Sequence, residues 1–311
     1  MTSRFVSGLQ MLTKAIVGST DSPMARPTIG LALGSGGANG LAHIAILQVF
    51  DELGIVPDRI VGTSIGAVIG GLYAAGLSAK KIQGIFEMVA GSPLEALSGL
   101  AKSNVKLADL VRFGRSGGLL DSGGFMRLLA THTEARTFEE LPIPLTVVAT
   151  DYWTADSVSI DAGDLFPAIE ASIAVPGLFM AVQRGEHLLI DGGTSNPLPF
   201  DLLQGTVDLV IAVDVSGNHQ TNNGQDIGLS DMLFNSFKIM QQAITRQALH
   251  HQPPDILLRP QAPDVRLLHF HRINEILTHA EPVAAMLRDQ LEDWLANWYS
   301  DSACLGRPTQ L

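Results

Sequence analysis

The sequence has little cysteine, little positive charge and no long uninterrupted apolar run. Its one cysteine, Cys304, excludes an intrachain disulfide framework and any multi-cysteine metal site, and it suits a reducing compartment. There are 20 Lys and Arg residues against 31 Asp and Glu residues, so the formal net charge is −11. This charge argues against electrostatic attraction to nucleic acid or to an anionic lipid surface. Any membrane contact should therefore depend on apolar burial.

The longest mainly apolar stretch, residues 60–77, approaches the length of a transmembrane helix. It contains Thr63, Ser64 and five glycines, so a helix buried in a folded core explains it better. With 311 residues, 46% of them hydrophobic, the chain can bury one large α/β core. We therefore expect a cytoplasmic protein whose contact with a membrane, if any, is peripheral. The sequence leaves the oligomeric state open.

Residues 1–27 form a separate N-terminal extension. Apolar residues at positions 5, 9, 12 and 16 have helical spacing, so the extension is either an amphipathic helix on a membrane or partner, or a locally docked or frayed terminus. Ser7, Gln10 and Thr13 interrupt the apolar core that a secretory signal would need. We expect a core over residues 28–215 and, over 216–311, a mainly helical part packed on the same domain.

The most informative stretch is residues 59–67, in which Ser64 stands between Gly62 and Gly66 as Gly-x-Ser-x-Gly. A short β-branched run precedes it and an Ala/Gly/Ile-rich segment with helical character follows, which is the pattern of a nucleophile elbow. Glycines let strand and helix approach closely around the turn, and the helix start aims N–H groups and a positive dipole end at the serine. The motif also arises by chance in a glycine-rich chain, so it needs support from its context.

A glycine-rich loop, residues 34–40, lies between an apolar strand and a helix, one β-α unit before Ser64. Gly34, Gly36 and Gly40 approximate the glycine pattern of a dinucleotide-binding loop, but a dinucleotide site also needs an acidic residue at the end of the next strand. Asp51 and Glu52 lie instead near the end of the helix, and no Gly-Lys-Ser/Thr follows, which excludes a P-loop. Backbone N–H groups of such a loop can instead bind the oxyanion of a tetrahedral intermediate, which is the better account here.

Asp191 directly follows an apolar strand and precedes Gly192 and Gly193. A carboxylate in that place could act as general base toward Ser64 if burial raises its proton affinity, although Asp-Gly-Gly is also an ordinary turn. A triad would need a histidine, and none has a distinctive spacing; His43 is expected to pack on its helix. The segment 269–271 would place two imidazoles on one face of a strand, without the carboxylates of a metal site.

Apolar strands alternate with helical segments, which indicates a largely parallel sheet covered on both faces. Besides the elbow, the expected strands are residues 28–33, 145–150, 158–161 (a hairpin partner of the preceding strand), 188–193, 209–214 and 255–258. The expected helices are residues 41–50, 78–89, 165–174, a long helix from 230, and an amphipathic helix over about 280–298. Trp294 and Trp298 in the last helix suit either a lipid interface or packing on the domain. Arg115, in an expected surface loop over 114–121, is either a head-group contact or a solvated side chain.

Four blocks in this order resemble the patatin-like phospholipase family, most closely its bacterial members and the neuropathy target esterase branch. They are residues 33–40 (LGSGGANG), 62–66 (GTSIG), 171–179 (ASIAVPGLF), and 191–193 (DGG) running into 196–199 (NPLP). Four spaced blocks rarely coincide by chance, and together they cover roughly residues 28–215.

The resemblance implies a three-layer α/β/α fold and a Ser-Asp dyad that hydrolyses lipid acyl esters through an acyl-enzyme. It assigns Ser64 as nucleophile and Asp191 as general base, and it implies no metal or organic cofactor. The N–H groups of Gly36 and Gly37 would form the oxyanion hole, and elbow geometry adds the N–H of Ile65. The supporting loop and elbow residues would be Gly34, Asn39, Gly40, Gly62, Gly66, Gly192 and Gly193.

The chain departs from the family at Asn39, where the family loop usually carries Arg or Lys. Asn39 can donate hydrogen bonds but has no charge, so an Asn39→Arg change should favour phospholipids over neutral esters. Three classes of function stay open: a serine acyl hydrolase acting on phospholipid, lysophospholipid or a neutral ester, a non-catalytic regulatory or lipid-binding protein on the same fold, and a nucleotide-binding protein. The intact Ser64 and Asp191 favour the first.

Overall fold

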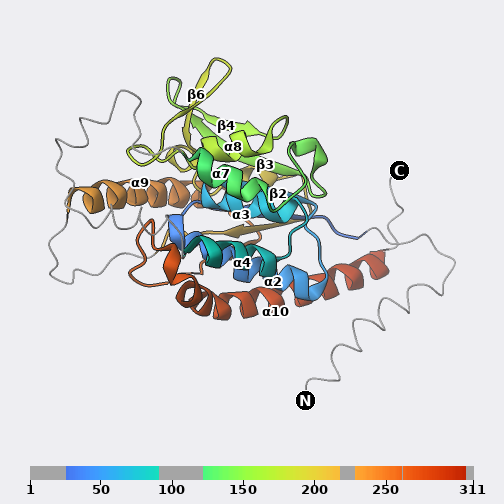
Figure 1. Cartoon of the computed structure of the whole chain (residues 1–311). Helices are drawn as coiled ribbons and strands as arrows, with labels where there is room; N and C mark the ends of the chain where they lie inside the picture. The colour runs from blue at the N-terminus through green and yellow to red at the C-terminus, as the bar shows by residue number, and fades with distance from the viewer. Residues whose placement is uncertain (1–25, 91–121, 218–227, 261, 306–311) are drawn as a thin grey trace. The chain divides into compact units, whose positions relative to one another are not determined.

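A computed structural model of the chain describes residues 26–90, 122–217, 228–260 and 262–305 (Figure 1). Residues Thr28–Asp289 form one compact unit, and the last part of the chain, from Gln290, belongs to a second. The predicted extension over residues 1–27 and the predicted loop over 114–121 lie almost wholly outside the described residues. The domain boundaries therefore stay a prediction.

The core of the larger unit is one eight-stranded mixed sheet in the order β5-β6-β3-β2-β1-β7-β8, with β4 also paired to β3. Strands β1, β2, β3, β7 and β8 are parallel, whereas β4 and β6 run antiparallel to β3 and β5 runs antiparallel to β6. The strands are β1 (Ile29–Leu33), β2 (Arg59–Thr63), β3 (Leu145–Asp151), β4 (Ser157–Ile160), β5 (Val182–Arg184), β6 (His187–Asp191), β7 (Leu209–Val213) and β8 (Ile256–Leu258).

Within the larger unit, helices pack on or beside this sheet (Figure 1). The α-helices are α2 (Ala42–Leu53), α3 (Ile65–Ala74), α4 (Ala79–Ala90), α7 (Gly123–Ala130), α8 (Leu165–Ser172), α9 (Leu229–His251) and α10 (Ile273–Leu305). The 3₁₀ helices are η2 (Gly37–Leu41), η3 (Phe138–Glu140), η4 (Gly192–Thr194), η5 (Phe200–Leu203) and η6 (Phe270–Arg272). None of these helices is long and apolar enough to cross a membrane.

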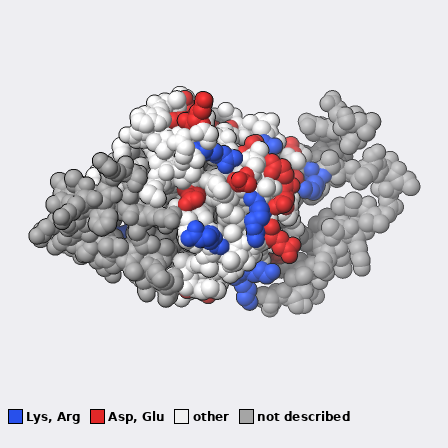
Figure 2. Space-filling model, turned by 45° about the horizontal axis from the view of Figure 1, so that its top comes forward, with Lys and Arg blue, Asp and Glu red and all other residues white. Residues whose placement is uncertain are grey.

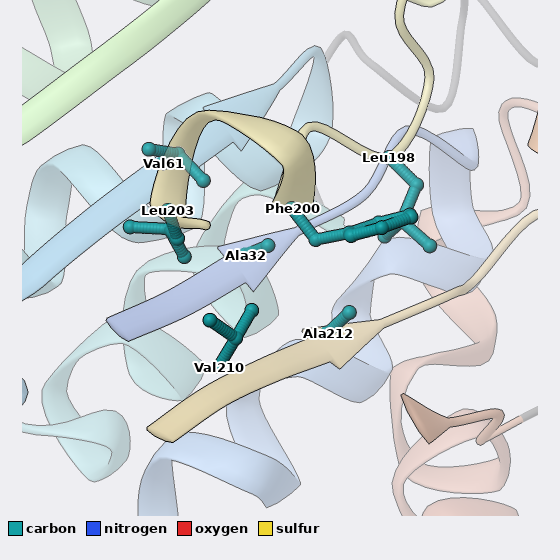
Figure 3. Close-up of a cluster of buried hydrophobic side chains, with 7 residues drawn as sticks. All are labelled: Ala32, Val61, Leu198, Phe200, Leu203, Val210 and Ala212. Atoms are coloured by element: carbon teal, nitrogen blue, oxygen red, sulfur yellow. The ribbon is translucent and has the colours of Figure 1, made fainter. Parts of the chain in front are cut away.

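The two faces of the central strands are covered by different elements, because side chains alternate along a strand. One face packs against η5 and the end of α9, and Figure 3 shows the resulting cluster of Ala32, Val61, Leu198, Phe200, Leu203, Val210 and Ala212. On the other face, Leu33 and Ile60 lie under α3 so closely that a Cβ on Gly70 would be 3.1 to 3.2 Å from their side chains. The predicted three-layer, mainly parallel α/β fold is therefore confirmed.

Strands β2 and β6 use the same edge of β3, end to end. The N–H of Ile60 in β2 donates to the carbonyl of Pro144, and the N–H of Tyr152 donates to the carbonyl of Leu188 in β6. Residues an even number of positions apart along a strand direct their backbone hydrogen bonds to the same edge, so β2 and β6 share that edge. The N–H of Asp151 bonds on the opposite edge, to the β4 side. Because β2 is parallel to β3 and β6 antiparallel, their carboxyl ends meet opposite Val148 and Ala149.

The sequence analysis predicts a largely parallel sheet without giving the direction of each strand, and the structure shows that β6, the strand before Asp191, runs antiparallel to β3. Most predicted elements are present within a few residues, and two expectations need correction. Helix α10 begins at Ile273, well before residue 280, and carries Pro282 in its interior. Residues 270–272 form η6, so His269 and His271 do not lie on a strand.

Candidate active site

Ser64 occupies a sharp turn between β2 and α3. Its backbone angles, φ 56° and ψ −122°, lie in a region that L-residues rarely adopt, at a cost of about 1–3 kcal/mol. The turn also brings strand and helix very close: a Cβ on Gly66 would lie 2.1 Å from the carbonyl oxygen of Leu33, and one on Gly62 would lie 2.7 Å from that of Gly66. Only glycine fits both positions, as the sequence pattern predicts.

Hydrogen bonds on both sides hold the strained turn in place. The N–H of Ser64 donates to Oγ of Ser172 at 2.8 Å, and the Ser172 hydroxyl donates to the carbonyl of Val148 at 2.6 Å. The Thr63 hydroxyl donates to the carbonyl of Asn196 at 2.9 Å. Ser172 belongs to the third block of the resemblance, yet no local pattern indicates that it supports the serine turn.

The structure brings Ser64 and Asp191 together. The Ser64 hydroxyl donates to Oδ2 of Asp191 at 2.7 Å, and the N–H of Gly193 donates to Oδ1 at 2.7 Å. Asp191 is fully buried and Ser64 is 6% exposed. Gly192 is confined by the same junction, since a Cβ there would lie 2.1 Å from the carbonyl oxygen of Val148.

Burial raises the pKa of Asp191 from its ordinary value of 3.8 to about 7, although the hydrogen bonds from Ser64 and Gly193 favour the charged form and oppose the shift. A carboxyl with a pKa near neutrality can both accept and return a proton at that pH. The Ser64 hydroxyl and the Asp191 carboxylate can therefore exchange a proton directly, without a histidine between them.

The glycine loop lies directly beside this pair. The N–H groups of Gly34, Ser35 and Ala38 donate to Val213, Pro197 and Leu267. In the part of the chain that the structure describes, no such bond is made by the N–H groups of the three predicted oxyanion donors, Gly36, Gly37 and Ile65.

Packing brings the glycine loop and the elbow into contact. A Cβ on Gly40 would lie 2.2 Å from Cγ2 of Ile65, and one on Gly34 would lie 2.9 Å from the carbonyl oxygen of Val213. Neither position has room for a side chain, so the loop approaches its neighbours closely at both glycines.

His43 braces the glycine loop from its helix, α2. It is fully buried, and its Nε2 lies 2.9 Å from the carbonyl oxygen of Gly34, so Nε2 carries the hydrogen and donates. Burial lowers the pKa of His43 to about 4, against the opposing effects of this bond and of Asp214, which keeps the ring neutral near pH 7. This geometry agrees with the expected packing role.

Helix α9 contributes polar side chains that the sequence analysis does not identify. Nε2 of Gln241 donates to Oγ of Ser35 at 3.1 Å, and a Cβ on Gly193 would lie 2.0 Å from the same nitrogen. Lys238, one turn earlier, approaches Asn39: a Cβ on Gly217 would lie 2.8 Å from Nζ of Lys238 and 3.0 Å from Nδ2 of Asn39. A cation that is absent at position 39 is thus present nearby in space.

Among the described residues, no group of three or more His, Cys, Asp or Glu side chains is placed to hold a metal ion. The fold and this geometry define an α/β protein in which a serine on a tight strand-to-helix turn is hydrogen-bonded to a buried aspartate. The chain belongs to the patatin-like phospholipase family, whose model matches residues 31–203. The predicted resemblance is confirmed, and members of this family generally hydrolyse lipid esters.

Two curated relatives illustrate the similarity. The NTE family protein Rv1063c of Mycobacterium tuberculosis is 36% identical over 193 residues, which cover 62% of this chain and 50% of that protein. The mouse patatin-like phospholipase domain-containing protein 6 is 31% identical over 199 residues, which cover 63% of this chain and 14% of that protein. The match thus spans half or less of the length of these relatives.

Among solved structures, VipD from Legionella pneumophila aligns with 89% of this chain and 73% of its own, at 13% identity and a TM-score of 0.47. The type III effector ExoU aligns with 86% of this chain and 53% of its own, at 15% identity and a TM-score of 0.38.

Proposed function

We propose that this protein is a serine acyl hydrolase that cleaves the carboxylic esters of phospholipids or lysophospholipids through an acyl-enzyme. The observation that carries the proposal is the 2.7 Å hydrogen bond from the Ser64 hydroxyl to a fully buried Asp191 whose pKa is raised to about 7. Membership of the family supports lipid esters as the substrate class.

In the proposed reaction, Asp191 accepts the Ser64 proton while Oγ attacks the ester carbonyl carbon. The N–H groups of Gly36, Gly37 and Ile65 donate to the resulting oxyanion. Collapse of the intermediate breaks the bond to the alcohol oxygen, which takes the proton from Asp191 and leaves. Asp191 then accepts a proton from water, whose oxygen attacks the acyl carbon. Collapse of this second intermediate breaks its bond to Oγ of Ser64, Oγ takes the proton back from Asp191, and the carboxylic acid leaves.

A fluorophosphonate probe tests this proposal, because it reacts with an activated serine and needs no knowledge of the lipid. Wild-type protein should be labelled and Ser64→Ala should not, and Asp191→Asn should lower labelling and ester hydrolysis by about a thousandfold or more. Ser195→Ala is the matched control, since Ser195 bonds to Thr150 and not to Asp191; it should still be labelled.

Absence of labelling in folded wild-type protein with lipid present would favour a non-catalytic regulatory or lipid-binding protein on the same fold. A panel of lysophospholipids, diacyl phospholipids and short-chain esters would then separate the substrate classes for a protein that is labelled.

A further inference from the structure

Between Met232 and Met240, one side of α9 exposes four large apolar side chains, with the exposed Ser236 among them. Met232, Leu233, Ile239 and Met240 are 52% to 57% exposed. At about 100° per residue, Met232, Ile239 and Met240 lie within one arc of the helix surface, together with the exposed Ala243. Large apolar side chains gathered on one helix face mark a site of contact.

The inward side of the same helix is polar and touches the candidate active site. Gln241 and Thr245 are 4% and 3% exposed, and Lys238 is partly buried. Gln241 reaches Ser35 in the glycine loop, and Nε2 of Gln242 donates to the carbonyl of Gly217. Met240 and Gln241 are neighbours in sequence, so the apolar face and the support of the glycine loop are two sides of one turn.

The charge of α9 also differs from that of the chain. Over Leu229–His251 it carries Lys238 and Arg246 and a single acid, Asp231, whereas the whole chain has 31 acidic against 20 basic residues. At about 100° per residue, position 231 lies outside the arc that holds Met232, Ile239 and Met240. An acid-free apolar face can enter the head-group region of a bilayer without burying a carboxylate.

We propose that this face of α9 docks on a phospholipid surface, with the side chains of Met232, Leu233, Ile239 and Met240 entering the boundary between head groups and acyl chains. The glycine loop beside Ser64 is then held next to the surface that contains the substrate. The choice of a lipid surface rests in part on the proposed function, since a lipid ester must leave that surface to reach Ser64.

Flotation with phosphatidylcholine vesicles tests the docking directly. The vesicle affinity of an Ile239→Asp/Met240→Asp variant should fall by about tenfold or more, because two charges replace two apolar contacts. The matched control is Val56→Asp/Met88→Asp, whose side chains are 56% and 59% exposed outside α9; it should bind as the wild type does. Ile239→Gln/Met240→Gln provides a milder variant if the first does not fold.

Three further readouts separate this docking from the chemistry. Fluorophosphonate labelling and hydrolysis of a short-chain soluble ester should be unchanged in the α9 variants, whereas hydrolysis of vesicle phospholipid should fall with binding. Ser64→Ala should bind vesicles as the wild type does, so a failure of the proposed reaction leaves the docking result intact.

Unchanged vesicle binding in both α9 variants would overturn the proposal. A wild-type dimer that the substitutions convert to a monomer, measured by light scattering, would assign the face to a second copy of this chain. If the α9 variants fold but unfold at a lower midpoint than the wild type without lipid, and the control variant does not, the α9 face would be assigned to contact with another segment of the same chain.

Discussion

At the scale of single residues, the buried carboxyl of Asp191 determines how activity depends on pH. Asp191 must be deprotonated to accept the Ser64 proton, and its pKa is raised to about 7. We expect kcat/KM for a soluble ester to fall about tenfold per pH unit below that value. A pH-rate profile measures it; a rate that stays constant down to pH 5 would contradict a base with this pKa.

The same group affects stability in the opposite direction. Because its folded pKa lies above the ordinary value of 3.8, Asp191 contributes stability that is fully present below pH 3.8 and is lost as the pH rises through about 7. The free energy of unfolding of Asp191→Asn relative to wild type should therefore increase over this range, by on the order of 4 kcal/mol. Denaturant titrations at several pH values measure this difference.

Lys238 changes the expectation for position 39. From sequence, Asn39→Arg should raise the ratio of phospholipid to neutral-ester turnover, but Nζ of Lys238 and the Asn39 amide both lie close to Gly217. Lys238→Met should lower that ratio by about tenfold if the ammonium contacts an anionic head group. Asn39→Arg should then raise the ratio more in the Lys238→Met background than alone, since like charges no longer repel. Equal effects in both backgrounds would mean that the two positions act independently.

At the scale of elements, two helical glycines with different surroundings predict opposite effects. Gly66→Ala forces a Cβ to within 2.1 Å of the carbonyl oxygen of Leu33, so α3 must move from β1. We expect a loss of several kcal/mol and of fluorophosphonate labelling. Gly84 in α4 is exposed and meets nothing within 4 Å, so Gly84→Ala should stabilise by about 0.5–1 kcal/mol and leave labelling unchanged. Thermal unfolding of both variants tests the contrast.

The elements also show what could be predicted from the sequence. Ser64, Asp191 and their glycines follow from local patterns, since each pattern fixes a turn at a strand end. The direction of β6 does not, because it depends on how the chain between β3 and β6 returns. Ser172, Lys238 and Gln241 reach the glycine loop or the serine turn from other helices, and no spacing in the sequence records those contacts.

At the scale of the whole molecule, the net charge of −11 disfavours contact with anionic lipids but not with zwitterionic ones. Figure 2 shows one face of the molecule, on which acidic and basic side chains are interspersed. Beside them lies a broad area without charged side chains. We expect binding to phosphatidylcholine vesicles to change little with salt. Adding an anionic lipid should weaken binding, and raising the ionic strength from about 10 to about 150 mM should partly restore it by screening. Tighter binding to anionic vesicles would contradict this prediction.

The meeting of β2 and β6 on one edge of β3 also concerns how the protein acquires activity as it folds. Ser64 and Asp191 are 127 residues apart in sequence, and their contact depends on two strands that reach the same edge from opposite directions. Closing so long a loop is entropically costly and tends to occur late. A refolding chain can therefore complete the elbow while its nucleophile is still without a base, and the recovery of fluorophosphonate reactivity would report the docking of β6 rather than the collapse of the core.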